Sequence, residues 1–180
     1  MNKKKPTSVI ISGLGISGLI TASLFCKEKI KVECFEPNDM SKFGVDQRTT
    51  AFLSPAIGVF KEIGIWKQIE PLSQPLKEME IIDVGSSKKG ESTSVVFKPK
   101  EINVENFGYN VPNDILRSEL LGWLRKNQNF VLNMGDSIID HYAFDNNILV
   151  KTAKGKKIYG KLLISCEGKD SAIRKREKIK

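Results

Sequence analysis

The chain has 180 residues, 40% of them hydrophobic and 28% charged, which fits a soluble globular protein and excludes a disordered tail. Its 29 basic and 21 acidic residues give a net charge of +8, and residues 151–180 alone hold 11 and 3 of them. The first 150 residues therefore carry 18 charges of each sign, without the broad basic face of a nucleic-acid-binding protein. A solvated basic tail is the simpler interpretation of the excess.

Cysteine and histidine usage excludes further classes of site. The three cysteines, Cys26, Cys34 and Cys166, are widely spaced without metal-ligand pairing, which favours reduced thiols in a cytoplasmic protein. The single histidine, His141, leaves no basis for a Ser-His-Asp triad or a histidine-rich metal site. We therefore nominate no catalytic side chain and no metal ligand. The apolar stretch near the N-terminus is interrupted by glycines and is too short to span a bilayer.

The first forty residues predict a βαβ unit. Residues 9–12 are rich in β-branched side chains and predict a strand buried on both faces, as in a parallel sheet. A Gly-x-Gly-x-x-Gly motif follows at residues 13–18, and residues 19–29 keep apolar side chains at helical spacing. Residues 32–36 predict a second strand that ends in a carboxylate. Lys29 stands where the helix should end, although glycine would end a helix more easily.

The spacing of this motif predicts a dinucleotide site. Gly13 allows the tight turn, Gly15 lets backbone N–H groups approach a diphosphate, and Gly18 lets the helix pack closely on the strand. Two further residues lie at the helix N-terminus, whose positive potential favours the diphosphate: Ile16 and Ser17. Glu36, about twenty positions on, would accept hydrogen bonds from the adenosine ribose and would repel the 2′-phosphate of NADP.

The next segments mix a helix with short strands. Residues 46–55 predict a polar entry into an apolar helix that continues to Trp66. Arg48 precedes that helix and has two open interpretations: a fixed cation beside a phosphate or ring edge, or a surface arginine paired with Asp46. Further along, we predict strands at residues 79–85 and 95–97, a loop at 86–94, a helix at 114–127 with Arg117 in its first turn, short strands over 130–164, and a final buried strand at 162–166.

At this point the chain resembles the FAD-dependent aromatic-ring hydroxylases, which have the para-hydroxybenzoate hydroxylase fold. Four blocks carry the likeness in the right order: residues 13–36, residues 46–51, residues 109–113 with Arg117, and residues 167–174. Within the family, the chain is most similar to the ubiquinone-biosynthesis hydroxylases that act on polyprenylated phenols. The likeness covers essentially the whole chain.

The resemblance implies a role for each block. Gly13, Gly15 and Gly18 would hold the FAD diphosphate and Glu36 the adenosine ribose. Three residues from the later blocks would lie near FAD: Arg48, Thr49 and Arg117. Glu167 and Gly168 resemble a second fingerprint that serves both FAD and the transient reductant NAD(P)H. The usual residue at position 167 in the family is Asp, so this contact departs from the pattern.

The resemblance also implies a fold and a domain plan. We expect an α/β fold: a Rossmann-type FAD-binding domain with an antiparallel strand insertion and part of a second, substrate-domain sheet. Residues 1–76 would form the FAD-binding βαβ part, residues 77–112 strands of the substrate domain, and residues 113–180 a return to the FAD-binding domain. The family's third motif, a Gly-Asp pair, is missing after residue 174, so the chain resembles the N-terminal part only. We therefore expect uncovered sheet edges or apolar faces and marginal solubility.

The implied function is an FAD-dependent monooxygenase that hydroxylates a polyprenylated phenol in ubiquinone biosynthesis, using NAD(P)H and O2. Two alternatives stay open: a truncated, catalytically inactive FAD-binding fragment, suggested by the missing third motif, and an NAD-dependent Rossmann dehydrogenase, suggested by Glu36 alone. The expected partner is the phenol substrate, with no nucleic acid. The expected location is cytoplasmic, with peripheral association at the inner membrane, or a complex with other ubiquinone-pathway proteins, left open.

Overall fold

The computed structural model describes residues 7–39, 46–84 and 92–180. The chain divides into two compact units: a first unit of Met1–Asp46 with Leu116–Lys180, and a second unit of Gln47–Ile115. Each unit combines strands with helices, so the predicted α/β class is confirmed. The loop predicted at residues 86–94 lies, up to residue 91, outside the described residues.

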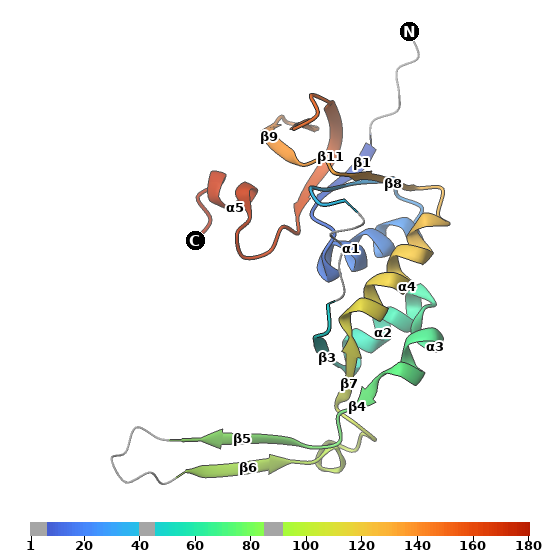
Figure 1. Ribbon diagram of the computed structural model, residues 1–180, viewed down its shortest axis with the longest axis vertical. Helices are drawn as coiled ribbons and strands as arrows, with labels where there is room; N and C mark the ends of the chain where they lie inside the picture. Colours follow the sequence, from blue (N-terminus) through green and yellow to red (C-terminus); the bar gives the residue numbers. More distant parts are fainter. Residues whose placement is uncertain (1–6, 40–45, 85–91) are drawn as a thin grey trace. The chain divides into compact units, whose positions relative to one another are not determined.

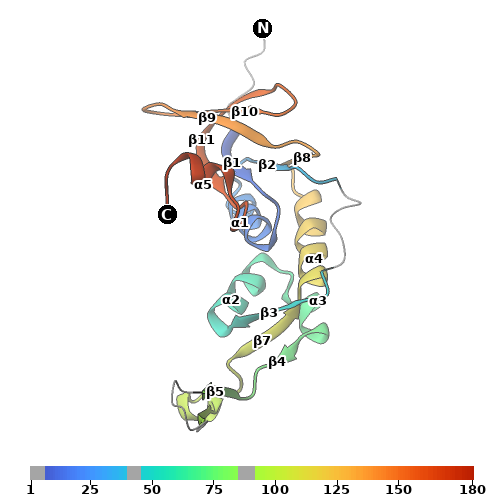
Figure 2. The same cartoon turned by 60° about the vertical axis from the view of Figure 1, so that its left-hand side comes forward.

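The first unit is built on a six-stranded sheet with the strand order β8-β2-β1-β11-β10-β9 (Figure 1). Four strands run parallel, and β9 and β10 add an antiparallel hairpin beside β11 (Figure 2). The predicted strands at residues 9–12 and 32–36, and the alternating strands over 130–164, are confirmed. Their bounds are β1 (Thr7–Ser12), β2 (Val32–Glu36), β8 (Phe130–Met134), β9 (Ile138–Ala143), β10 (Ile148–Thr152) and β11 (Lys157–Ser165).

Strand β1 is central because it pairs in parallel with both β2 and β11. Its side chains Ile10 and Ile11 are fully buried, as expected for a strand covered on both faces. One face belongs to a core cluster that includes Ile10, Phe35, Ile138 and Val150. Helix α1 (Ile16–Lys27) contacts β1 and β2 and buries one side of its own: Gly18, Leu19, Ala22, Ser23 and Cys26.

Two predictions about single elements, the end of the first helix and the burial of the last strand, have different outcomes. Helix α1 ends at Lys27, and Lys29 takes a positive φ of 59°, the left-handed conformation that glycine would adopt more easily. The prediction of a buried strand at residues 162–166 is wrong, because Leu162 is 45% exposed. Successive side chains of a strand point to opposite faces, and only the face with Leu163 packs on the core cluster.

The second unit holds an antiparallel sheet of three strands, in the order β3-β7-β4. The prediction that residues 46–55 only lead into a helix is wrong, because residues 49–53 form a strand that pairs with residues 108–112. Helix α2 begins directly after this strand. The elements are β3 (Thr49–Leu53), α2 (Ser54–Ile63), α3 (Trp66–Ile69), the 3-10 turn η1 (Glu70–Leu72), β4 (Gln74–Pro75), the 3-10 turn η2 (Pro99–Ile102) and β7 (Gly108–Pro112).

A two-stranded ribbon, β5 (Met79–Asp83) paired with β6 (Thr93–Phe97), completes the second unit and confirms the predicted strands there. The register pairs Met79 with Phe97 and Ile81 with Val95, so these four apolar side chains share one face. All four are at least 36% exposed, which is the uncovered apolar face that the sequence predicts. The marginal solubility expected from it stays a prediction.

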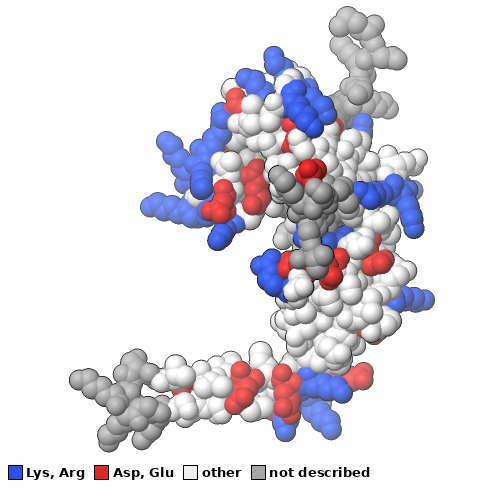
Figure 3. Space-filling view, viewed as in Figure 1, with Lys and Arg blue, Asp and Glu red and all other residues white. Residues whose placement is uncertain are grey.

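The first unit also contains α4 (Asn113–Arg125), which begins in the second unit, and the short helix α5 (Ala172–Arg176). Figure 3 shows Lys and Arg side chains gathered over the part of the first unit that contains β11 and α5. Within the described part of the chain, none of the helices is long and apolar enough to cross a membrane.

Two glycine-to-alanine variants test the close approach of β3 and β7. Gly108 has a φ of 153°, and a Cβ there would lie 2.0 Å from the Phe52 carbonyl oxygen. We expect Gly108→Ala to lower the free energy of unfolding by about 2 kcal/mol or more, because the strands must separate. Gly122 lies on α4 with open space around a Cβ, so Gly122→Ala should raise that free energy by up to about 1 kcal/mol. Urea unfolding measures both, and equal effects would contradict the prediction.

Candidate functional site

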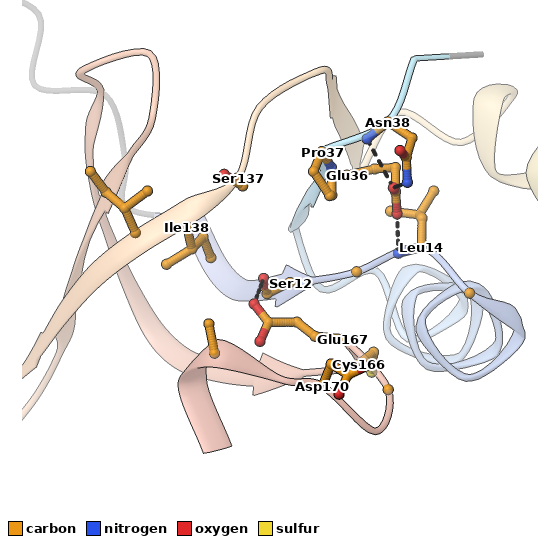
Figure 4. A pocket seen from close by; sticks show the side chains of 15 residues that line it. Ser12, Leu14, Glu36, Pro37, Asn38, Ser137, Ile138, Cys166, Glu167 and Asp170 are labelled. Carbon is orange, nitrogen blue, oxygen red and sulfur yellow. Dashed lines mark hydrogen bonds between the residues drawn. The ribbon is translucent and has the colours of Figure 1, made fainter. Parts of the chain in front are cut away.

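A pocket of about 720 Å³ opens at the carboxyl ends of β1, β2 and β11 in the first unit (Figure 4). It is lined by the turn after β1, by Glu36 at the end of β2 and Asn38 after it, by Ile138 of β9, and by the turn after β11. The carboxyl edge of a parallel sheet is where open α/β folds bind their ligands. The pocket therefore brings together two of the predicted blocks that lie about 130 residues apart in the sequence, 13–36 and 167–174.

The glycine turn has the shape that the motif predicts. A Cβ at Gly13 would lie 2.5 Å from the Cys166 carbonyl oxygen, and one at Gly18 would lie 2.1 Å from the Gly13 carbonyl oxygen. A Cβ at Gly15 would meet nothing within 4 Å. Gly15 is the N-cap of α1 and lines the pocket, so the N-terminus of that helix, whose first N–H groups have no partner within the helix, lies at the pocket. Their partial positive charge suits an anionic ligand.

Glu36 lines the pocket although it is only 7% exposed. Its Oε2 accepts a hydrogen bond from the Leu14 N–H at 3.0 Å. Its Oε1 accepts two bonds from Asn38, one from the backbone N–H at 3.1 Å and one from Nδ2 at 2.8 Å. A carboxylate has about four acceptor positions, so these three bonds leave about one for a ligand donor. Glu36 is therefore anchored by the protein and still able to hold a hydroxyl group.

Glu167 faces the pocket from the turn after β11 and is bound from several sides. Its Oε1 accepts from Ser12 Oγ at 2.6 Å, and its Oε2 accepts from Ser171 Oγ at 2.7 Å and from the Ile173 N–H at 3.1 Å. Burial by itself would raise the pKa of Glu167, but these hydrogen bonds, together with the nearby Ala172 backbone, hold its pKa below the ordinary value. Glu167 thus stays ionised at neutral pH.

Cys166 also lines the pocket and is the least buried of the three thiols. Burial raises its pKa, and a hydrogen bond with Thr21 offsets part of that rise. Burial raises the pKa of Cys26 to about 11 and the pKa of Cys34 further still. None of the thiols is therefore an activated nucleophile, which needs a lowered pKa. Among the described residues, no group of three or more His, Cys, Asp or Glu side chains could hold a metal ion.

Three predicted cofactor residues are not among the residues that line this pocket. Arg48 and Thr49 belong to the second unit, where the Arg48 carbonyl oxygen accepts from the Asn113 N–H at 3.0 Å. Thr49 pairs with Pro112 across β3 and β7. Arg117 is half-buried on α4, in the first unit. None of the three lines the pocket, so their part in a cofactor site stays a prediction.

Sequence reasoning missed several polar residues of the pocket and its wall. The missed residues are Ser12, Asn38, Ser137, Asp170 and Ser171. Ser12 is the last residue of the first predicted strand and Asn38 lies two residues after the second, and this position is the only signal that could have marked them. Ser171 carries no local signal beyond being a serine before a short helix, where a capping role is common.

No family model matches the chain, but comparison with known proteins finds similar ones. The chain is 24% identical to 3-demethoxyubiquinol 3-hydroxylase of Escherichia coli over 175 residues. This match covers 94% of the chain but 43% of that protein, so the chain spans less than half the length of the curated relative.

Several solved structures with the same fold are described as monooxygenases or hydroxylases. The p-nitrophenol 4-monooxygenase of Pseudomonas putida is similar with a TM-score of 0.71 and 16% identity, over 94% of this chain and 42% of that one. The probable FAD-dependent monooxygenase PqsL of Pseudomonas aeruginosa gives 0.69 and 18%, over 96% and 45%. Aklavinone-11 hydroxylase, solved with FAD and aklavinone, gives 0.72 and 16%, over 99% and 36%. The predicted resemblance is therefore confirmed: the chain is similar, over less than half of their length, to flavin-dependent monooxygenases.

Proposed function

We propose that the pocket of the first unit binds FAD and that the chain provides the cofactor-binding part of an aromatic-ring hydroxylase. The observation that carries the proposal is the convergence of the glycine turn, Glu36 and the Glu167–Gly168 turn on one pocket. The glycine turn supports it further, because larger side chains at Gly13 and Gly18 would collide with backbone atoms, whereas Gly15 leaves room for a ligand. The residues present therefore fit a dinucleotide with a diphosphate.

Each part of the pocket would hold a different part of FAD. The N–H groups at the start of α1, from Ile16, Ser17 and Gly18, would bind the diphosphate, and the remaining acceptor position of Glu36 would bind the adenosine ribose. The turn with Glu167 and Gly168 would close the opposite wall. Arg48, Thr49 and Arg117 are proposed as further FAD contacts on the resemblance of their blocks alone.

The proposed substrate is a polyprenylated phenol, supported by the similarity to 3-demethoxyubiquinol 3-hydroxylase, and NAD(P)H is the proposed reductant. FAD, when bound, supplies the redox and oxygen chemistry, and the residues of this chain bind it, orient it and exclude water. These separate roles of cofactor and protein suit a pocket that has a hydrogen-bonded carboxylate, Glu36, and a cysteine, Cys166, whose pKa is not lowered. Peripheral membrane association, or a complex with other proteins of the pathway, is part of the proposal because the substrate is lipidic.

Two variants of equal size at Gly15 test diphosphate binding. Gly15 has an ordinary φ of −63°, and its Cβ would enter open space, so Gly15→Asp and Gly15→Asn should both fold and cap α1 well. A carboxylate at this position repels the FAD diphosphate, whereas the amide does not. We expect Gly15→Asp to bind FAD at least about tenfold more weakly than Gly15→Asn, measured by quenching of flavin fluorescence. Equal affinities would place the diphosphate elsewhere.

Alkylation of Cys166 gives a second test at the pocket. Because burial raises the pKa of Cys166, we expect slow reaction with iodoacetamide at neutral pH and a faster reaction as rising pH forms the thiolate. Bound FAD should slow this reaction further, because Cys166 lines the proposed site. Peptide mass spectrometry with and without FAD measures the modification, with the more buried Cys26 as internal reference. A rate at Cys166 that saturating FAD leaves unchanged would contradict the assignment.

Turnover tests the hydroxylase part of the proposal separately. FAD-loaded protein is supplied with NADH or NADPH, O2 and a prenylated phenol, and the product is identified by mass spectrometry. We expect reductant oxidation coupled to a hydroxylated product. FAD binding without product would restrict the function of this chain to cofactor binding. Binding of NAD with no affinity for FAD would instead support the dehydrogenase alternative.

A further inference from the structure

The antiparallel strands β9, β10 and β11 turn one face to the core of the first unit and the other face away from it (Figure 2). Val150 is buried in the core cluster, and Ile148 and Ile158 pack against that cluster. Because successive side chains of a strand point to opposite faces, the residues between these three point away from the core. We call them the outer face, which consists of Asp140 and Tyr142 on β9, Leu149 and Lys151 on β10, and Lys157, Tyr159 and Lys161 on β11.

An apolar row crosses the middle of the outer face. The register pairs Leu149 with Tyr142 on one side and with Tyr159 on the other. Tyr142 is 40% exposed and Tyr159 51% exposed, and Phe144 in the turn after β9 is 58% exposed. A tyrosine combines an apolar ring with a polar hydroxyl, and this combination is typical of side chains at a boundary between water and an apolar phase.

The outer face is also positively charged. Residues 146–166 contain five lysines and no acidic residue; three of these lysines lie on the outer face and two in the turn between β10 and β11. Asp140 is the acidic residue of the face, and it pairs with Lys151 at 3.6 Å and with Arg176 of α5. Arg176 and the three lysines outnumber this one carboxylate, which leaves a net charge of +3.

The cations and the aromatic rings alternate along β11. Lys157, Tyr159 and Lys161 are all exposed and occupy every second position, so the two lysine Cα atoms lie about 13 Å apart with the tyrosine between them. The charge is therefore spread along a strand instead of converging on one point. A spread row of ammonium groups around an interfacial ring matches a layer of anionic headgroups over an apolar phase.

A single-stranded nucleic acid fits the outer face less well. Stacking of a base needs an open ring face. Two cations already lie over the ring of Tyr142, the Lys151 ammonium at 4.7 Å and the Arg176 guanidinium at 5.8 Å from the ring centroid. The cations of the strands are also all lysines, which attract phosphates as point charges, whereas bidentate recognition of phosphates and bases uses arginine.

We propose that the outer face docks on an anionic phospholipid bilayer, with Lys157 and Lys161 among the headgroups and the rings of Tyr159 and Phe144 at the boundary with the acyl chains. This proposal gives a location to the peripheral membrane association in the proposed function and rests on that part of it. It does not depend on FAD binding, because none of these four residues lines the FAD pocket.

Flotation of the whole chain with vesicles tests the proposal, and aggregated protein does not float. One vesicle type contains equal parts of phosphatidylcholine and phosphatidylglycerol, and the other contains phosphatidylcholine alone. We expect binding to the first type only, and weaker binding as the salt concentration rises. Each lysine near an anionic bilayer contributes a factor of about five, so the double variant Lys157→Gln, Lys161→Gln should bind about tenfold or more weakly.

A second double variant is the matched control. Lys61→Gln with Lys67→Gln removes the same charge from two exposed lysines of the second unit and should leave vesicle binding unchanged. Tyr159→Ser should weaken binding and Tyr159→Phe should retain it, because the bilayer boundary takes up the ring.

Equal binding to both vesicle types, unchanged binding of the Lys157→Gln, Lys161→Gln variant, or an equal loss in the control variant would each overturn the proposal. Binding of a single-stranded oligonucleotide that these two lysines support, with no vesicle binding, would overturn it in favour of nucleic acid. FAD binding by the same preparations separates the two proposals. A chain that binds vesicles through these lysines but no FAD keeps the docking surface and loses the cofactor site, and a chain that binds FAD but no vesicles loses the docking surface.

Discussion

The close approach of three strand ends around Gly13 is the constraint on which the site depends. The Gly13 N–H donates to the Phe35 carbonyl of β2 at 2.8 Å, and the Cys166 N–H donates to the Ser12 carbonyl at 2.7 Å. No side chain fits between these backbones, because a Cβ at Gly13 would lie 2.5 Å from the Cys166 carbonyl oxygen. The pocket therefore takes its shape from backbone packing, and the carboxylates of Glu36 and Glu167 are placed by where β2 and β11 end.

The sequence could predict elements whose residues carry a local pattern. The β-branched run of β1, the helical spacing of α1 and the strand before Glu36 are examples, since each depends on neighbours within a few positions. Strand β3 and its pairing with β7 were missed because this pairing joins residues about sixty positions apart, and residues 49–53 continue without a break into α2. The residues around Phe52 predict an apolar helix from their local pattern. In the structure, Phe52 lies on β3, and its ring packs edge-on against the ring of Phe60 on α2, with 4.9 Å between the ring centroids.

The candidate site, like the fold, could be predicted only where its residues form a local pattern. Gly13, Gly15, Gly18 and Glu36 belong to one continuous motif, whose spacing carries a physical reason for every residue. The hydrogen-bond partners of the carboxylates could not be predicted, because a serine in a loop or at a strand end has no distinguishing pattern. Ser12 and Glu167 are 155 residues apart, and only the parallel pairing of β1 with β11 brings them together. For that reason, the hydrogen bonds that Glu167 accepts from the protein could not be predicted from the sequence.

The basic excess of the last thirty residues has a partly structural role around α5. Arg176 and Lys151 both pair with Asp140 of β9, and the Lys151 ammonium lies 4.7 Å from the centre of the Tyr142 ring. His141 of the same strand lies 2.8 Å from Glu177, directly after the helix. The start of α5 is held by Glu167 and its end by β9, while Ile173 between them packs on the core cluster. A helix of five residues has little stability of its own, so these contacts at both ends determine where the pocket wall before it lies.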